Sequence, residues 1–455
     1  MKLFVREKYF YKTLVSIALP IALQNLIAIG VSMLDTLMLG ALGDVALSAS
    51  SLANQPFFIF SVLIFGIASG SAVLTAQYWG KKDVDTIQLI FGMALKVAIV
   101  FSFLFFLVSY LFPEQIMRIF TNEEDVIAAG VEYLSITCFA NLIFGVSSIL
   151  VSLFRSVEVV GIALASAITT LIVNGCLNYV LIFGKFGFPA MGVRGAAIAT
   201  LTARCVEFVI ILLYITVFEK KIKLSLRKML PNKKVLWQDF VKYSSPVVVN
   251  EFMWSFATSM QAIVIGRLGK AVVAANSVAS VVQQLATVFI WGVASASAVL
   301  IGKTIGEGDA RRAKSYSNTL QVICVLIGIF ATTAILLLRQ PVIGFYNISD
   351  EAKMYADQLL TVLSFMVFFI SYTSPTLVGI LRGGGDIKFV MWLDIIFLWL
   401  VTTPLGFLTA FVFRFPPWLV FAIMRMDEPI KSVIAFFRLR GSKWIRNVTR
   451  ENVAE

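Results

Sequence analysis

Apolar residues run in long, nearly unbroken stretches along this chain, and short polar segments separate them. A helix needs about 20 apolar residues to cross the hydrocarbon core of a bilayer. The pattern therefore predicts an all-α integral membrane protein with twelve transmembrane helices. We place the spans at residues 13–37, 50–78, 90–112, 128–150, 158–183, 195–217, 241–265, 276–302, 316–338, 355–380, 389–413 and 416–437.

The sequence repeats itself after 226 positions, so that Pro20 aligns with Pro246 and Gly80 with Gly306. The register holds without a gap over some 60 residues, which indicates a duplication, because Gly, Pro and Asp seldom match together by chance. Six spans per half is an even number, so the repeat is parallel, as in several transporters that bind substrate between two lobes. We assign the lobes, linker and tail as follows: 1–218 amino-terminal lobe, 219–240 cytoplasmic linker, 241–437 carboxy-terminal lobe and 438–455 basic cytoplasmic tail.

Basic residues gather in every second polar segment, which indicates the side of the membrane. If the amino terminus is inside, inside segments hold 27 Lys and Arg, with Lys242 and Lys431 near the inner span ends counted among them, and outside loops hold 8. The positive-inside rule then places both termini in the cytoplasm. The net charge of +12 therefore reflects topology, and we expect no nucleic acid partner. The start, MKLFVREKYFYK, lacks a cleavage pattern and is interpreted as a retained cytoplasmic lead-in.

The composition argues against the familiar enzyme classes. Hydrophobic residues make up 59% of the chain and charged residues 14%, whereas soluble proteins carry about 25% charge. His is absent, which removes the usual proton shuttle, the commonest metal ligand and the His-based triads. The four Cys are scattered through apolar stretches without a CxxC pattern. We expect no enzymatic activity, no catalytic residue and no cofactor.

Ionisable residues inside the spans are the first candidates for function, because each costs about 2.5–3.5 kcal/mol in hydrocarbon. Asp35 lies in span 1, and Glu251 lies in span 7 one turn after Pro246. Asp35 is either hydrated near the outer surface or binds a proton or sodium ion. Glu251 is either hydrogen-bonded across helices or part of a cavity wall. Carboxylates removed from water hold protons near neutral pH, which suits ion coupling.

Other charged residues in the spans favour simpler roles. Arg204 and Glu207 are three apart and share a helix face, so we predict a neutralising pair that fixes packing. Asp394 either pairs with Lys388 or takes part in function. Lys96 is expected to snorkel or to pair.

Amide side chains lie at similar depths. Asn174 and Asn178 are one turn apart, so their oxygens either bind one cation or bond to a neighbouring helix. Further polar groups are candidates for a substrate cavity: Gln24, Gln55, Asn250, Gln283, Gln284, Arg204 and Glu207. Aromatic and Met side chains of span 7 face either cargo or lipid: Phe252, Met253, Trp254 and Met260.

Several motifs, in order, resemble the multidrug and toxic compound extrusion family of bacterial drug efflux transporters. They are LPIALQNLIAIGVSMLDTLMLGALG, FGIASGSAVLTAQYWGKKD, GVRGAAIATLTAR, SSPVVVNEFMWS, GVASASAVLIGKTIGEGD and LVGILRGGGD. The likeness covers roughly residues 10–437. It implies twelve helices in two six-helix lobes around a central cleft, and exchange of inward protons or sodium ions for outward organic cations by rocking between two states.

The resemblance also implies particular ion-coupling residues. Asp35, Asn174, Asn178 and Thr200 match the family's amino-lobe site, and Glu251 matches the acidic residue of the other lobe. Many members carry Asp where this chain has Asn178. One carboxylate with amide and hydroxyl oxygens favours H+ over Na+, although both stay open, with Na+ at Asp35 as the possible metal. Asp427, Glu428 and Pro429 interrupt span 12, so we expect a short or broken final helix.

The sequence thus predicts a secondary active antiporter of the inner (cytoplasmic) membrane that exports organic, often cationic, drugs. We expect a monomer whose partners are small organic cations and membrane lipids. One alternative is a flippase for lipid-linked oligosaccharides, whose pyrophosphate cargo requires several buried Arg or Lys. Another is an intramembrane enzyme, which needs a nucleophile–base pair or metal ligands. A signalling or structural membrane protein gives no account of the buried acids.

Overall fold

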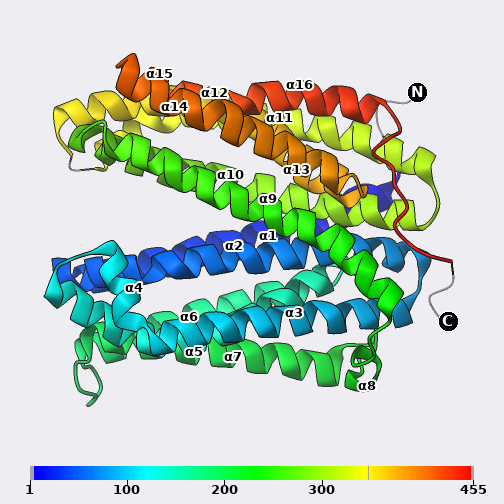
Figure 1. Cartoon of the computed structure of the whole chain (residues 1–455), viewed down its shortest axis with the longest axis horizontal. Helices are drawn as coiled ribbons and strands as arrows, with labels where there is room; N and C mark the ends of the chain where they lie inside the picture. Colours follow the sequence, from blue (N-terminus) through cyan, green and yellow to red (C-terminus); the bar gives the residue numbers. More distant parts are fainter. Residues whose placement is uncertain (1–4, 347, 452–455) are drawn as a thin grey trace. The chain divides into compact units, whose positions relative to one another are not determined.

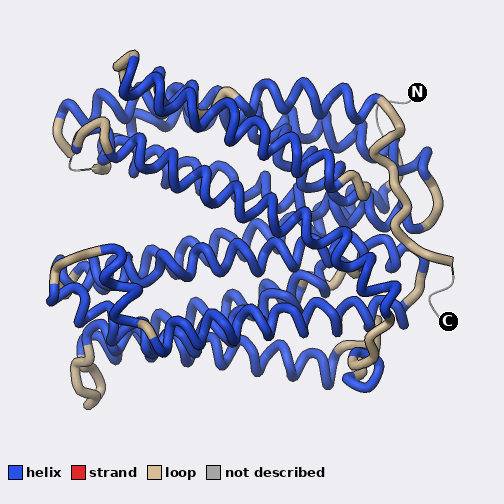
Figure 2. Tube along the Cα trace, in the orientation of Figure 1, coloured by secondary structure: helices blue, strands red, loops and turns tan. Residues whose placement is uncertain are grey.

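The computed structural model describes residues 5–346 and 348–451, and in these residues every regular element is a helix (Figures 1 and 2). The helices are α1 Lys8–Gly40, α2 Asp44–Lys81, α3 Val84–Leu111, α4 Pro113–Phe120, α5 Glu124–Ser156, α6 Gly161–Phe183, α7 Gly192–Leu213, α8 Leu226–Met229, α9 Lys234–Gly266, α10 Lys270–Gly306, α11 Ala310–Gly344, α12 Asp350–Ser374, α13 Ile387–Ile396, α14 Thr403–Phe407, α15 Pro417–Ile423 and α16 Asp427–Arg440. The all-α prediction is confirmed.

Ten helical stretches of the described residues are long and apolar enough to cross a membrane. The two remaining predicted spans fall on α9, which is long but less apolar, and on α15 with α16. The last span is broken between residues 423 and 427, as the Asp-Glu-Pro sequence indicated. The short helix α4 lies where the sequence pattern had placed a loop.

Tertiary contacts divide the chain into two compact units. Unit 1 comprises Met1–Ala22, Ala76–Lys82 and Val249–Glu455, and unit 2 comprises Leu23–Thr75 and Asp83–Val248. Unit 1 therefore contains the first part of α1 and the last turns of α2 together with most of the second sequence half. The predicted division at the 219–240 linker follows the sequence repeat and stays a prediction.

Unit 2 is held together by close helix contacts as well as by apolar side chains. Leu39, Met117, Tyr133 and Ile182 belong to its buried cluster. At Gly195, α7 comes so close to α6 that an added Cβ would lie 2.7 Å from the Leu181 carbonyl carbon. Small residues allow such contacts, which supply much of the packing between helices in membranes.

Unit 1 packs α10 in the same way against the helical segment Pro375–Leu381, which follows α12. An added Cβ at Gly379 would lie 2.7 Å from the carbonyl oxygen of Ala294 on α10. The buried cluster around these helices includes Val278, Ile290, Leu359 and Leu363.

The backbone of the second half departs repeatedly from regular α-helix. A π-helical segment, Pro375–Leu381, continues α12, and two more, Phe397–Thr402 and Leu408–Val412, flank α14. Such segments turn side chains to new directions and often accompany functional sites. Arg382 follows the first of them directly.

Replacing Gly195 by Ala tests the tight α6–α7 contact. The new methyl group meets backbone atoms, so we expect a loss of about 1–3 kcal/mol in stability. The control is Gly30→Ala in α1, where nothing lies within 4 Å of an added Cβ. Because Ala favours helix, this control should be unchanged or gain up to about 1 kcal/mol. Melting curves of the purified protein in detergent measure both, and equal melting temperatures would contradict the contact.

Candidate functional site

Asp35 of α1 lies against two amide side chains of α6. Nδ2 of Asn178 donates to Oδ1 of Asp35 and, over 3.1 Å, to Oδ1 of Asn174. Nδ2 of Asn174 in turn donates to Oγ1 of Thr200 on α7 over 3.4 Å. The four residues predicted for the amino-terminal ion site therefore form one connected chain across three helices.

One polar atom of this chain has no partner. Asn178 is 0% exposed, and its Oδ1 accepts no hydrogen bond in the described structure. Buried polar atoms without a partner are rare in proteins, so this oxygen indicates a place for an additional group. A protonated Asp35 has an O–H to donate, and a bound cation accepts oxygen ligands. Tyr133 of α5, which lies beside Asp35 and Thr200, adds a hydroxyl to the same region.

The predicted pair on α7 is present. Nη1 of Arg204 lies 2.7 Å from Oε2 of Glu207, and the guanidinium lies over the ring of Phe144, 4.9 Å from its centre. Both side chains are largely withdrawn from solvent, with exposures of 27% and 11%. This geometry fits the structural role that the spacing predicted.

Gln24 has a partner that the sequence did not reveal. Its Oε1 accepts a hydrogen bond of 2.9 Å from Nη2 of Arg155, near the end of α5. Sequence reasoning counted Arg155 only as a topology signal. Nε of Arg155 has no hydrogen-bond partner in the described structure.

In unit 1, Glu251 of α9 forms a buried ion pair. Its Oε1 lies 2.9 Å from Nη1 of Arg382, and the two side chains are 12% and 2% exposed. The predicted spans 355–380 and 389–413 had left Arg382 in the polar segment between them. The π-helical segment before it instead leaves the side chain inside the unit.

Asn250, the neighbour of Glu251, contacts a second buried group of charges. Its Nδ2 donates to Oδ2 of Asp394 over 3.1 Å. Nζ of Lys431 lies 2.8 Å from Oδ1 of Asp394 and 2.7 Å from Oδ2 of Asp427. Of the two alternatives for Asp394, the pairing with Lys388 is wrong: Lys388 is exposed, and the break before α16 lets Lys431 reach Asp394 instead.

The carboxylates of this region outnumber its cations among the described residues. Thr373 donates to a fourth carboxylate, that of Glu428, while Arg425 lies over the ring of Phe421. The acids are Glu251, Asp394, Asp427 and Glu428, and the cations are Arg382, Arg425 and Lys431. A buried excess of negative charge favours uptake of a proton or cation. The sequence signal was the pair of acids before Lys431, which we interpreted only as a helix break.

Three predicted cavity residues are not brought into these clusters. Gln55 and Gln284 are exposed, and Gln283 is half-buried. Their assignment to a substrate cavity stays a prediction.

Lys96 has polar partners in the segment between α8 and α9. Its Nζ donates to the Leu230 carbonyl oxygen over 2.6 Å and to Oδ1 of Asn232 over 2.7 Å. The prediction that Lys96 is paired is confirmed.

Two hollows lie elsewhere in unit 1. An apolar one of about 290 Å³ is lined by Phe252, Met253, Phe256 and Trp399. The rings of Phe256 and Trp399 stack at 5.5 Å. Phe252 and Met253, two of the span 7 side chains expected to face either cargo or lipid, thus line a hollow.

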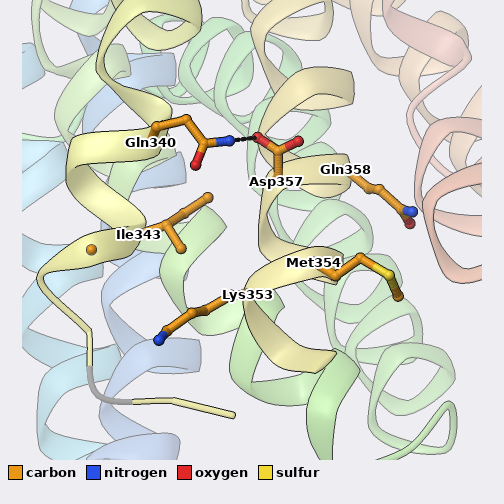
Figure 3. A pocket seen from close by; sticks show the side chains of 7 residues that line it. Gln340, Ile343, Lys353, Met354, Asp357 and Gln358 are labelled. Atoms are coloured by element: carbon orange, nitrogen blue, oxygen red, sulfur yellow. Dashed lines mark hydrogen bonds between the residues drawn. The ribbon is translucent and has the colours of Figure 1, made fainter. Parts of the chain in front are cut away.

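The second hollow, of about 460 Å³, lies between the end of α11 and the start of α12 (Figure 3). Gln340 donates to Oδ1 of Asp357 over 2.8 Å at its edge. No predicted site residue lines it.

Comparison with known proteins gives a family match in both halves. A family model described as MatE matches residues 20–180 and 246–408. The two matches begin 226 residues apart, which is the spacing of the repeat seen in the sequence.

Similar curated proteins cover nearly the whole chain. A probable multidrug resistance protein NorM of Thermotoga maritima is 25% identical over 450 residues, covering 98% of this chain and 96% of that protein. A protein of the same name from Agrobacterium fabrum is 28% identical over 419 residues, covering 90% of this chain and 88% of that protein.

Solved structures have the same fold. A MATE crystal structure in complex with MaL6 has a TM-score of 0.85 at 18% identity, covering 94% of this chain and 95% of the other. An outward-facing multidrug resistance MATE transporter of the MOP superfamily has a TM-score of 0.85 at 18% identity, covering 95% and 96%. These likenesses confirm the predicted fold of twelve membrane helices in two lobes.

Replacing Arg382 by Gln tests the burial of the Glu251 pair. Removing one partner leaves a buried carboxylate without its counter-ion, which costs about 3–5 kcal/mol. We expect a large drop in melting temperature in detergent. The control is Arg118→Gln, which removes an exposed pairing with Glu114 and Glu124 and should leave the melting temperature nearly unchanged. A similar small effect of both changes would show that Arg382 is not buried with Glu251.

Proposed function

Because the chain belongs to the multidrug and toxic compound extrusion (MATE) family, we propose that it is a secondary active antiporter that exports organic cations in exchange for protons. It is a transporter by family, and its similar proteins carry the name of multidrug resistance protein NorM. The observation that supports ion coupling most directly is Asp35, which lies in a membrane helix and is bound to a buried amide whose oxygen is unpartnered.

The choice of a proton follows from the ligands available at Asp35. A sodium ion prefers several hard oxygen ligands, and a second carboxylate helps to balance its charge. Here Asn178 stands beside Asp35, and Oδ1 of Asn174 is already occupied by the Asn178 amide. A proton needs only the Asp35 carboxylate, with Asn178 Oδ1 as an acceptor for the new O–H.

Export then follows from mutual exclusion. A proton on Asp35 and a cationic drug neutralise the same negative charge, so each weakens binding of the other. We propose that each ligand favours a different state of a rocker switch, with the protein open to one side of the membrane at a time. A ligand shifts such an equilibrium only by its difference in affinity for the two states.

The second half contributes another acidic region. The carboxylates around Glu251 exceed the cations beside them, which suits either proton binding or attraction of cationic cargo. We propose that Glu251 belongs to the coupling machinery, with Arg382 as the counter-ion that stabilises its ionised form.

The flippase alternative needs free basic groups for a pyrophosphate. Arg204, Arg382 and Lys431 each lie within 3 Å of a carboxylate, with distances of 2.7, 2.9 and 2.7 Å. Three other basic residues discussed above have different partners: Arg155 donates to an amide oxygen, Lys96 donates to an amide and a carbonyl oxygen, and Arg425 lies over the ring of Phe421. Because the basic residues beside Glu207, Glu251 and Asp427 are already neutralised by carboxylates, cationic cargo is favoured over a diphosphate.

We further propose that the protein lies in the cytoplasmic membrane with both termini inside, as a monomer. The 27 to 8 bias of basic residues supports this orientation. The proposed exchange needs neither a cofactor nor a catalytic residue, since the proton gradient supplies the energy.

The function is tested by ethidium transport in everted membrane vesicles that contain the protein. An imposed proton gradient at constant sodium should drive ethidium transport, and an imposed sodium gradient at constant pH should not. Transport that follows only the sodium gradient would contradict the choice of ion. Absence of ethidium and fluoroquinolone transport under both gradients would contradict the proposed antiport.

Replacing Asp35 by Asn imitates the permanently protonated carboxyl group. We expect proton-driven transport to fall by on the order of tenfold or more, the usual size of a coupling interaction, while expression stays normal. Asp44→Asn, at an exposed site at the start of α2, is the matched control and should transport normally. Unchanged transport by Asp35→Asn would remove Asp35 from the mechanism.

Replacing Glu251 by Gln keeps the size of the side chain and removes its titratable charge. Transport should fall by on the order of tenfold, with membrane expression near that of the wild type. Glu351→Gln, at an exposed site near the start of α12, is the control. Normal efflux by Glu251→Gln would show that the residue is structural.

A further inference from the structure

The cytoplasmic ends of α2 and α10, which are equivalent helices of the repeat, touch backbone to backbone in unit 1. An added Cβ at Gly80 would lie 2.0 Å from the Lys303 carbonyl oxygen, and one at Gly306 would lie 1.9 Å from the Gln77 carbonyl oxygen. Gly80 and Gly306 correspond in the repeat, as do residues 77 and 303. The contact is therefore symmetric, and it joins a helix of the first half to one of the second.

The carboxy-terminal segment Ser442–Glu451 lies across this junction. In Figure 1 it is the red strand-like trace that leaves α16 and runs towards the C label. It is attached to the second half by Trp444, which is 0% exposed, and by Arg446. The Arg446 backbone N–H donates to the Gly384 carbonyl oxygen over 2.8 Å, and its Nη2 lies 2.8 Å from Oδ1 of Asp386.

The same segment binds the end of α2 mainly through Gln77. This side chain is 0% exposed, and three hydrogen bonds join it to the second half. Its Nε2 donates to the carbonyl oxygens of Gly383, over 3.2 Å, and Arg446, over 3.1 Å. Its Oε1 accepts the backbone N–H of Val448 over 2.8 Å.

Two neighbours of Gln77 lengthen this contact. The hydroxyl of Tyr78 accepts the Arg450 backbone N–H over 3.2 Å, and Nζ of Lys81 donates to the Arg450 carbonyl oxygen. The carboxy-terminal segment and α2 are thus joined along a full turn of the helix.

We infer that residues 442–451 form a latch that holds the cytoplasmic ends of the two halves together and must release Gln77 before the cytoplasmic side opens. This inference rests on the proposed function, because alternating access requires the α2–α10 junction to separate. The tail is anchored on the second half through Trp444 and Asp386, so the bonds that open are those to α2. Gln77 loses its partners in the open state, and its amide then needs water.

The latch makes the symmetric junction asymmetric. Lys303 of the second half corresponds in the repeat to Gln77 of the first half. The carboxy-terminal segment binds Gln77. The latch therefore stabilises the cytoplasm-closed state beyond what the glycine contact provides. Its strength sets the fraction of molecules that open inward without a ligand.

The test measures the distance between spin labels at Lys82→Cys and Arg311→Cys, two exposed sites in the first and second half, in lipid nanodiscs. The native cysteines are first replaced. Gln77→Leu removes the three hydrogen bonds while keeping a similar volume. We expect the ratio of open to closed molecules to rise at least about tenfold. A chain that ends at Ser442 should show the same shift.

The matched control is Gln88→Leu. Gln88 is also a buried glutamine that binds a non-helical segment, donating to the Ile222 carbonyl oxygen and accepting from the Ser225 N–H. All of these residues lie in unit 2, so the distance between the labels should not change.

Combining Gln77→Leu with the truncation should add little to either change alone, since both remove the hydrogen bonds between Gln77 and the carboxy-terminal segment. Unchanged distances in both variants, an equal shift in Gln88→Leu, or fully additive shifts would overturn the latch.

Ethidium transport by the wild type separates the latch from the proposed function. If the wild-type protein transports ethidium while the latch variants keep the closed distance, only the latch is wrong. Absence of wild-type transport contradicts the proposed function instead.

Discussion

Charge inside a bilayer must be neutralised, and this constraint determines where the chain carries its polar groups. An ionised side chain costs several kcal/mol in hydrocarbon, so it needs a counter-ion, a hydrogen-bonding partner or a proton. Glu251, Asp394 and Asp427 have buried cations at 2.7–2.9 Å. Asp35 has a neutral amide instead. A carboxylate without a fixed counter-ion is the group whose charge changes most readily when a proton or a cationic drug arrives.

Duplication gave the two halves the same helices, and substitution then gave them different chemistry. In the first half, Asp35 accepts a hydrogen bond from Asn178, which is linked through Asn174 to Thr200. In the second half, the broken last helix brings Lys431 to Asp394, and a π-helical segment brings Arg382 to Glu251. The irregular backbone of the second half is thus what allows its charges to pair. The junction of α2 and α10 likewise combines symmetric glycines with a substitution, since Gln77 of the first half corresponds to Lys303 of the second.

The sequence predicted what depends on periodicity and spacing. Apolar stretches predicted the helices, and matching residues at a spacing of 226 positions predicted the duplication. Spacing along one helix gave the pair of Arg204 and Glu207. Pairings between distant segments were not accessible. Lys388, the partner considered for Asp394, is 6 residues away in sequence, whereas Lys431, its partner in the structure, is 37 residues away and lies after the break in the last span. Arg382 and Gln77 were missed for a similar reason, because a Gly-rich connection and a helix end look exposed until the tertiary contacts cover them.

The most direct measurement is the number of protons released when a cationic drug binds to the purified protein in weakly buffered solution. Mutual exclusion predicts release of about one proton per ethidium bound at a pH where Asp35 is protonated in the free protein, and drug affinity that rises with pH. The same measurement on Asp35→Asn should show binding without this proton. Drug binding to the wild type that releases no protons at any pH between 5 and 9, or equal release by both proteins, would contradict the account.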